Sequence, residues 1–406
     1  MISMSPEPRV IELFEYEPLE VARQQLPLEA AELIRREYSN VIKVEATSFL
    51  PDSTWKLTAQ GYVGYLPLTP DVGLRLLPKV PIENIFRMLE YAYNLESFHL
   101  LEGLVDCSSL EDFYDRLARL LAVQVLSRGR RGFYRSYQKR SEQLPFVRGR
   151  LDLRAACQKP WDTRIACHFE EHTPDVDENR ILAWTLLQIL HSGLCTERSL
   201  PLVRQAYRNT AGFVHLSPCQ AEECISRHYS RLNQDYQPMH ALCRFFLEHR
   251  GPGHETGDRK MMPFLVKMYR LYELFVAKWL EEHLPSGFSI QSQEPVIIDS
   301  NLDIKFKIDL SIFNEKTGRC IYVMDTKYKS KQPSATDIQQ VTAYAETKDC
   351  QEAILIYPEG FGTVLRGKVG QINIRSVVFP LDGDLEKAGN MFVKDLFGIG
   401  AEENIG

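Results

Sequence analysis

Two carboxylates and a lysine in the C-terminal third of the chain have the residue types and spacing of a hydrolytic metal site. Asp309 is followed after fifteen residues by Asp325, and Lys327 comes two positions later. Like charges held close together raise one pKa unless a cation lies between them. Mg²⁺ suits such a pair, because it takes one or two carboxylates, keeps waters and can hold a phosphate oxygen. The pattern predicts metal-assisted phosphoryl chemistry, in which Lys327 serves the attacking water or the phosphate.

The elements that must position these groups are two strands joined by a turn. Residues 301–313 alternate apolar and polar side chains, the period of a strand with one buried face, and Asp309 falls on the polar face. Residues 315–318 supply a turn before a second strand, 319–328, in which Asp325 and Lys327 share one face. A hairpin of this kind places Asp309 beside Asp325. The alternative is a solvated hairpin with ordinary surface charges.

A helix predicted over 265–284 precedes the hairpin. Its apolar stripe consists of Leu265, Tyr269, Tyr272, Val276, Leu280 and Leu284. Glu273 lies at the edge of this stripe, where its carboxylate is partly desolvated. It is either an accessory ligand or an edge residue paired with a lysine.

A second helix is predicted after the hairpin. Ser334 and Asp337 form a capping-type start, and Gln340 and Tyr344 are four apart on one face. The order of Glu273, Asp309, Asp325-x-Lys327 and Gln340-x₃-Tyr344 resembles the PD-(D/E)xK nuclease superfamily. The resemblance implies catalytic roles for all six residues and metal binding by Asp309, Asp325 and Glu273. It also implies a C-terminal restriction-endonuclease-like α/β core with a mixed sheet.

Composition indicates a soluble globular protein of two or three domains. The 406 residues are 44% hydrophobic and 25% charged, and no apolar run has the length of a membrane span. The N-terminus lacks the features of a signal peptide, and the nine cysteines never form Cys-x-x-Cys pairs. We therefore expect a cytoplasmic protein with reduced thiols and no structural zinc.

A basic segment, residues 127–154, stands out from a chain whose net charge is −6. It holds nine Lys or Arg residues and two acidic ones, with Phe and Tyr interleaved. Such a segment suits phosphates and exposed bases, an acidic protein partner, or simply a solvated face. The candidate DNA contacts are Arg128, Arg130 and Arg131, which have no apolar context, together with Arg135. Whether the segment binds DNA or protein stays open.

The pattern along the chain predicts an α+β protein of three domains. Residues 1–105 are β-rich with short strands, as in a small barrel or sandwich, and form a docking module. Residues 106–259 are helical and carry the basic segment, and a Gly-rich joint follows at 250–258. Residues 260–406 form the nuclease domain.

Several motifs resemble the McrC family, the nuclease subunits of modified-cytosine restriction systems. The resemblance extends from about residue 61 onward and departs at Ile308, where a proline commonly precedes the first catalytic aspartate. The matching segments are 77–92 (Leu-Pro-Lys, then Ile-x-Asn-Ile-Phe-x-Met-Leu-x-Tyr-Ala), 147–152 (Val-Arg-Gly-Arg-Leu-Asp), 262–276, 325–329 (Asp-Thr-Lys-Tyr-Lys) and 340–345 (Gln-Val-Thr-Ala-Tyr-Ala).

The resemblance implies a Mg²⁺-dependent endonuclease acting on double-stranded DNA beside an McrB-like AAA+ GTPase ring, whose hydrolysis it stimulates. GTP belongs to the partner, because the only phosphate-loop-like segment here, 362–369, has Val369 where a magnesium-binding Ser or Thr is required. Two alternatives remain. One is a regulatory adaptor of the ring without cleavage, and the other is a free-standing repair nuclease.

Overall fold

The computed structural model describes most of the chain in two compact units. The described residues are 9–47, 54–93, 109–158, 161–225, 227–251, 253–256, 259–261, 263–299, 304–329, 332–360, 362 and 364–398. One unit joins residues 1–110 with 263–406, and the other comprises 111–262. The N-terminal strands and the C-terminal core therefore belong to one compact body, although about 150 residues of sequence separate them. The three-domain division stays a prediction.

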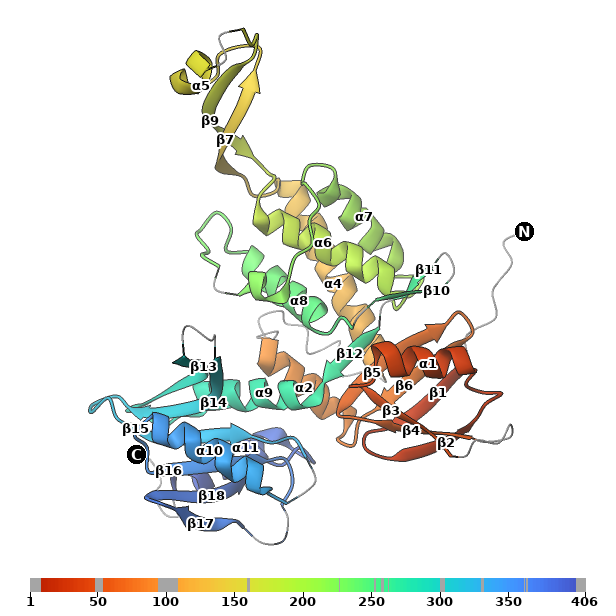
Figure 1. Cartoon of the computed structure of the whole chain (residues 1–406), viewed down its shortest axis with the longest axis vertical. Coiled ribbons are helices and arrows are strands. Elements are labelled where there is room, and N and C mark those ends of the chain that lie inside the picture. Colours follow the sequence, from red (N-terminus) through yellow and green to blue (C-terminus); the bar gives the residue numbers. More distant parts are fainter. Residues whose placement is uncertain are drawn as a thin grey trace. The chain divides into compact units, whose positions relative to one another are not determined.

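Two sheets and a helix build the N-terminal part of the first unit (Figure 1). The first sheet has the order β1 (Arg9–Phe14), β6 (Val72–Leu77), β5 (Tyr62–Thr69) and β12 (Phe264–Lys267). The second has the order β2 (Pro18–Ala22), β4 (Thr54–Ala59) and β3 (Ile42–Ala46). Helix α1 (Leu28–Glu37) and both sheets share one apolar core that includes Trp55, Tyr38 and Leu66. Pro81 then precedes helix α2 (Ile82–Tyr93).

The helix predicted over 265–284 is wrong at its start. Residues 264–267 form β12, which pairs antiparallel with β5 from Phe264↔Tyr65 to Lys267↔Tyr62, and helix α9 begins at Met268 and ends at His283. Pairing with distant strands overrides the local helical pattern here, because three buried apolar residues complete a sheet whose other strands lie about 200 residues or more earlier. The buried face of α9 changes accordingly, and Tyr269 is 52% exposed.

A six-stranded mixed sheet forms the C-terminal part of the same unit. Its order is β13 (Phe288–Asp299), β14 (Ile304–Asn314), β15 (Cys320–Thr326), β16 (Glu352–Tyr357), β18 (Ile372–Val378) and β17 (Arg366–Val369). The first three strands are antiparallel, whereas β15, β16 and β18 are parallel. Helices α9, α10 (Ala335–Thr347) and α11 (Leu385–Phe397) pack against it. The segment at 366–369 is an exposed strand and not a phosphate loop.

The second unit consists of a group of helices and a β-arm (Figure 1). Its helices are α4 (Leu110–Arg131), α6 (Asp177–Ser192), α7 (Leu200–Ala211), α8 (Tyr236–Glu248) and the 3₁₀ helix η2 (Ala221–Cys224), beside the small hairpin β10 (His254–Thr256) and β11 (Arg259–Met261). The arm consists of β7 (Ser136–Leu144), β9 (Ile165–Thr173), β8 (Arg150–Leu151) and the short helix α5 (Leu153–Gln158).

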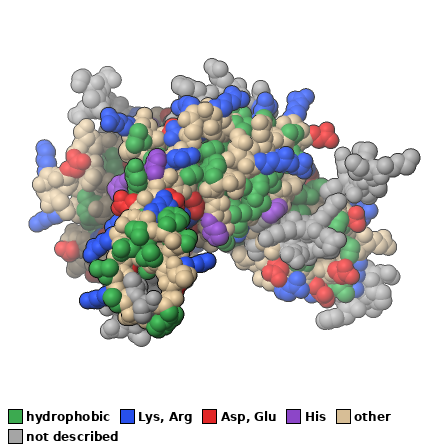
Figure 2. Space-filling model, turned by 90° about the horizontal axis from the view of Figure 1, so that it is seen from above, with side chains coloured by type: hydrophobic (Ala, Val, Ile, Leu, Met, Phe, Trp, Pro, Cys, Tyr) green, Lys and Arg blue, Asp and Glu red, His purple; other side chains and the backbone are tan. Residues whose placement is uncertain are grey.

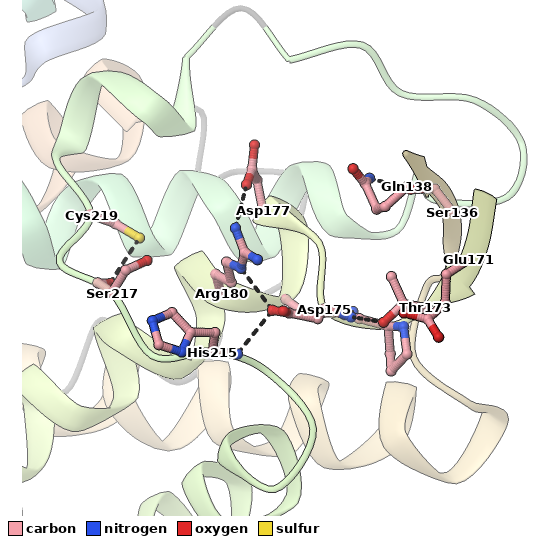
Figure 3. A network of polar contacts seen from close by, with 12 residues as sticks. Ser136, Gln138, Glu171, Thr173, Asp175, Asp177, Arg180, His215, Ser217 and Cys219 are labelled. Carbon is pink, nitrogen blue, oxygen red and sulfur yellow. Dashed lines mark hydrogen bonds and ion pairs between the residues drawn. The ribbon is translucent and has the colours of Figure 1, made fainter. Parts of the chain in front are cut away.

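The arm corrects the expectation that residues 106–259 are wholly helical. Strand β9 alternates buried Cys167 and Phe169 with exposed neighbours, which is the period of two of a strand. The sequence signal is weak because the segment is short and rich in polar residues. Asp175 ties the end of β9 to the helices (Figure 3). Its carboxylate accepts hydrogen bonds from Arg180 Nε at 2.7 Å and from the backbone N–H of His215 at 2.9 Å.

Eight cysteines lie in the part of the chain that the structure describes, and all have free thiols. Within those described residues, no helix has both the length and the apolar character needed to cross a lipid bilayer.

Candidate active site

The predicted hairpin brings Asp309 and Asp325 together. Strands β14 and β15 pair with Leu310 opposite Met324, so the two aspartates are the next pair along the ladder. Asp309 Oδ2 accepts hydrogen bonds from the backbone N–H of Thr326 at 3.0 Å and from its hydroxyl at 3.2 Å. Thr326, which sequence reasoning did not single out, thus holds one carboxylate against the strand that carries the other.

Asp325 is the more deeply placed carboxylate, at 1% exposure. Burial raises the pKa of Asp325 to about 8, and the negative charge of Asp309 adds to the shift, whereas Lys327 opposes it. A buried acid that repels its neighbour favours any cation placed between the two groups. The oxygen donors and their crowding therefore fit a hard divalent ion such as Mg²⁺.

Lys327 lies against this pair just beyond the end of β15. Its Nζ is 2.7 Å from Asp325 Oδ2 and donates to Gln340 Oε1 at 2.9 Å. Burial alone would lower the pKa of Lys327, but the Asp325 carboxylate raises it overall. The ammonium therefore stays charged at neutral pH, which suits charge stabilisation better than proton abstraction.

Helix α10 supplies the remaining polar groups from one of its faces. Gln340 Nε2 donates to the Tyr344 hydroxyl at 2.6 Å, and the Tyr344 ring stacks on Phe306 with centroids 5.0 Å apart. Since Gln340 also accepts from Lys327, the three side chains form one chain of hydrogen bonds. The spacing of four thus lets Gln340 bond the lysine while Tyr344 bonds Gln340.

Asp337 and Lys329 belong to this cluster and were missed as site residues. Asp337 completes the capping box with Ser334, lies 3.9 Å from Lys327 Nζ and is hydrogen-bonded by Lys329. Burial opposes ionisation of Asp337, but bonds from Lys329 and Ser334 lower its pKa overall. The only sequence signal for Asp337 was its role as a helix cap.

Glu273 on α9 interacts with the cluster through the charge of Asp309. Its carboxylate pairs with Arg270 at 3.0 Å, whereas one of the two alternatives for this residue was a pair with a lysine. Burial and, to a smaller extent, the Asp309 charge raise the pKa of Glu273 to about 7, although Arg270 opposes the shift. Among the described residues no three His, Cys, Asp or Glu side chains are arranged to hold a metal ion. Asp309 and Asp325 therefore form the preformed part of the candidate metal site.

The four candidate DNA-binding arginines differ in their surroundings. Arg128 is packed, contrary to the expectation that it lacks apolar context: it lies over the Tyr236 ring at 5.2 Å and pairs with Asp235 at 3.3 Å. Arg131 also pairs with Asp235, at 3.1 Å. Arg130 and Arg135 are exposed, and these two remain the better candidates for DNA contact.

The fold is of the α+β class, with a mixed sheet flanked by helices. An acidic pair and a lysine at one strand end form its candidate hydrolytic site. A family model described as the McrBC 5-methylcytosine restriction system component matches residues 57–358. The chain therefore belongs to that family, and the resemblance read from its motifs is confirmed.

Two known proteins illustrate the relationship. The type IV methyl-directed restriction enzyme EcoKMcrBC of Escherichia coli strain K12 is 23% identical over 269 residues, covering 62% of this chain and 74% of that protein. A chain in the half-complex of Thermococcus gammatolerans McrB AAA+ hexamers with bound McrC aligns with a TM-score of 0.54. It is 20% identical, and the alignment covers 96% of this chain and all of the other. At this identity the second likeness concerns the fold alone.

Proposed function

We propose that this chain is the Mg²⁺-dependent, PD-(D/E)xK-type endonuclease subunit of a GTP-driven restriction complex directed at modified cytosine. The observation that carries the proposal is the meeting of Asp309 and Asp325 beside Lys327, within a chain of the McrBC family. The core around these residues would be of the restriction-endonuclease type. Its partner would be an McrB-like AAA+ ring that binds the GTP.

The residues divide the chemistry between them. Asp309 and Asp325 would hold Mg²⁺, which supplies an acidified water and offsets charge on the phosphate. Lys327, kept protonated by Asp325, would orient the water or stabilise the phosphate oxygens. Gln340 and Tyr344 hold the lysine in place. Glu273 would act from the rim, exchanging its bond with Arg270 for a contact with the ion's waters.

The test is cleavage of methylated plasmid with the partner ring and GTP. We expect Asp325→Ala and Lys327→Ala to lower cleavage by at least about 100-fold. Their stimulation of the partner's GTP hydrolysis should remain, since neither change touches the proposed docking module. Normal cutting by both variants would remove the assignment.

Two other functions are separated by the same assay. An adaptor that only regulates the ring would stimulate GTP hydrolysis and never cut, even as wild type. A free-standing repair nuclease would cut with divalent metal alone, without partner or nucleotide. Cleavage that needs both the ring and GTP supports the proposed function.

A further inference from the structure

Glu15 is a buried carboxylate that links the N-terminal strands to the candidate active site. It follows β1, is fully buried, and its Oε2 accepts hydrogen bonds from the Tyr328 hydroxyl at 3.0 Å and the Lys79 backbone N–H at 3.3 Å. Its Oε1 has no hydrogen-bond partner in the structure. Burying such a group is costly, so its presence here points to a role beyond packing.

Tyr328, the other end of this link, directly follows Lys327. Strand β15 ends at Thr326, and the backbone N–H of Lys327 makes a last bond to Ile356. The Tyr328 ring also contacts Tyr272, with centroids 6.0 Å apart, and Tyr272 precedes Glu273 in helix α9. One side chain therefore adjoins the backbone of Lys327 and the helix that carries Glu273.

Packing alone does not hold the Tyr328 ring. A pocket of about 400 Å³ borders it, with Tyr16, Lys79 and Lys329 among the lining residues. Burial and the neighbouring Glu15 both raise the pKa of Tyr328, so its phenol stays protonated and donates. Because the ring faces open space on one side, the hydrogen bond to Glu15 supplies the constraint that packing lacks.

We infer that Glu15 is a positioning residue for the nuclease site, acting through Tyr328 on Lys327. This inference rests on the proposed function. It assigns the N-terminal strands a part in aligning the catalytic lysine in addition to any docking role. Removing either partner of the bond would let the segment after β15 shift, and small displacements of a catalytic group cost much of the rate.

Steady-state cleavage by the complete complex tests the inference. We expect Glu15→Ala and Tyr328→Phe each to lower kcat about ten-fold with little change in KM, because the groups that bind substrate are untouched. The double variant should be no slower than either single one, since both remove the same bond. Glu15→Gln, which keeps an acceptor oxygen for Tyr328, should restore most of kcat.

Asn84 provides the matched control. It also joins the N-terminal part to the C-terminal part, through bonds from Nδ2 to the carbonyls of Leu381 at 2.8 Å and Gly383 at 3.0 Å, but neither carbonyl belongs to the site. Asn84→Ala should lower the unfolding temperature and leave kcat unchanged.

Each outcome has a distinct reading. Wild-type kcat in Glu15→Ala and Tyr328→Phe, or an equal decrease in Asn84→Ala, overturns the positioning role while the nuclease assignment stands. Strictly additive decreases in the double variant overturn it too. A wild-type complex that never cuts overturns the proposed function, and the inference with it.

Discussion

The acidic pair sets the behaviour of the site at the scale of single residues. Asp325 ionises at higher pH in the folded chain than its ordinary value of 3.8, because it is buried beside Asp309. Between pH 3.8 and about 8, the folded state therefore keeps a proton on Asp325 that the unfolded state has lost. Without metal, the free energy of unfolding contributed by this group is greatest below the ordinary pKa and falls as pH rises toward about 8.

Magnesium binding should therefore grow stronger with pH. Below the raised pKa the ion must displace a proton from Asp325, which weakens apparent affinity by up to about ten-fold per pH unit. We expect the rise in unfolding temperature caused by Mg²⁺ to be larger at about pH 9 than at about pH 6. Differential scanning fluorimetry of the isolated chain measures it.

The Asp325→Asn variant is the critical test of this prediction. Asp325→Asn should abolish the Mg²⁺-induced shift, whereas Asp395→Asn, which changes an exposed carboxylate on α11, should keep it. A shift of equal size at both pH values, or one that persists in Asp325→Asn, would place the ion elsewhere.

At the scale of elements, the pairing of β5 with β12 is one of the links between the N-terminal and C-terminal parts of the first unit. Gly64 has a φ of +135°, and a Cβ at this position would meet the Phe264 carbonyl oxygen at 2.1 Å. That oxygen belongs to the backbone and cannot turn aside. The close approach of the two strands therefore requires glycine.

Gly64→Ala should destabilise the first unit by at least about 3 kcal/mol, from strained φ and steric overlap together. Urea unfolding measures the decrease in stability. Gly370→Ala is the control, since Gly370 also has a positive φ, +58°, but nothing lies within 4 Å of its Cβ position. It should cost about 1–2 kcal/mol. Similar destabilisation in both variants would mean that the close approach of β12 to Gly64 adds nothing to the cost of a positive φ.

Local patterns account for what the sequence predicts well. The alternation in β14 and the Ser334–Asp337 capping box are set by neighbouring residues, and both form where expected. By contrast, β12 is a strand only because β5 lies beside it, and Arg128 is packed only because α8 brings Asp235 and Tyr236 to it. Such partners, about 100 or 200 residues away, leave no local signal.

The β-arm gives the whole molecule an exposed apolar surface. Its described residues include Phe146, Val147, Leu153 and Trp161, which are 60%, 57%, 68% and 78% exposed. Hydrophobic and basic side chains lie next to one another on the face shown in Figure 2. Large exposed apolar side chains within one part of a fold are a feature of protein-interaction sites.

We expect the arm to contact the partner ring, so Phe146→Ser with Trp161→Ser should weaken complex assembly by about ten-fold or more. Analytical ultracentrifugation with the ring and GTP measures it. Tyr269→Ser, which removes an exposed aromatic ring from α9, is the control and should assemble normally. Unchanged assembly by the arm variant would leave docking to the N-terminal strands alone.

The exposed arginines of the basic segment belong to a chain whose net charge is −6, and strong DNA affinity by this subunit is unnecessary if the proposed partner ring delivers the DNA. Arg130→Ala with Arg135→Ala should reduce DNA binding and cleavage across all sequences alike. The salt dependence of binding should flatten by about one slope unit for each DNA phosphate that the variant no longer neutralises. Arg198→Ala with Arg204→Ala removes the same charge from exposed positions in the same unit and should change neither. A decrease in GTPase stimulation, with cleavage per GTP unchanged, would instead assign the segment to the protein interface.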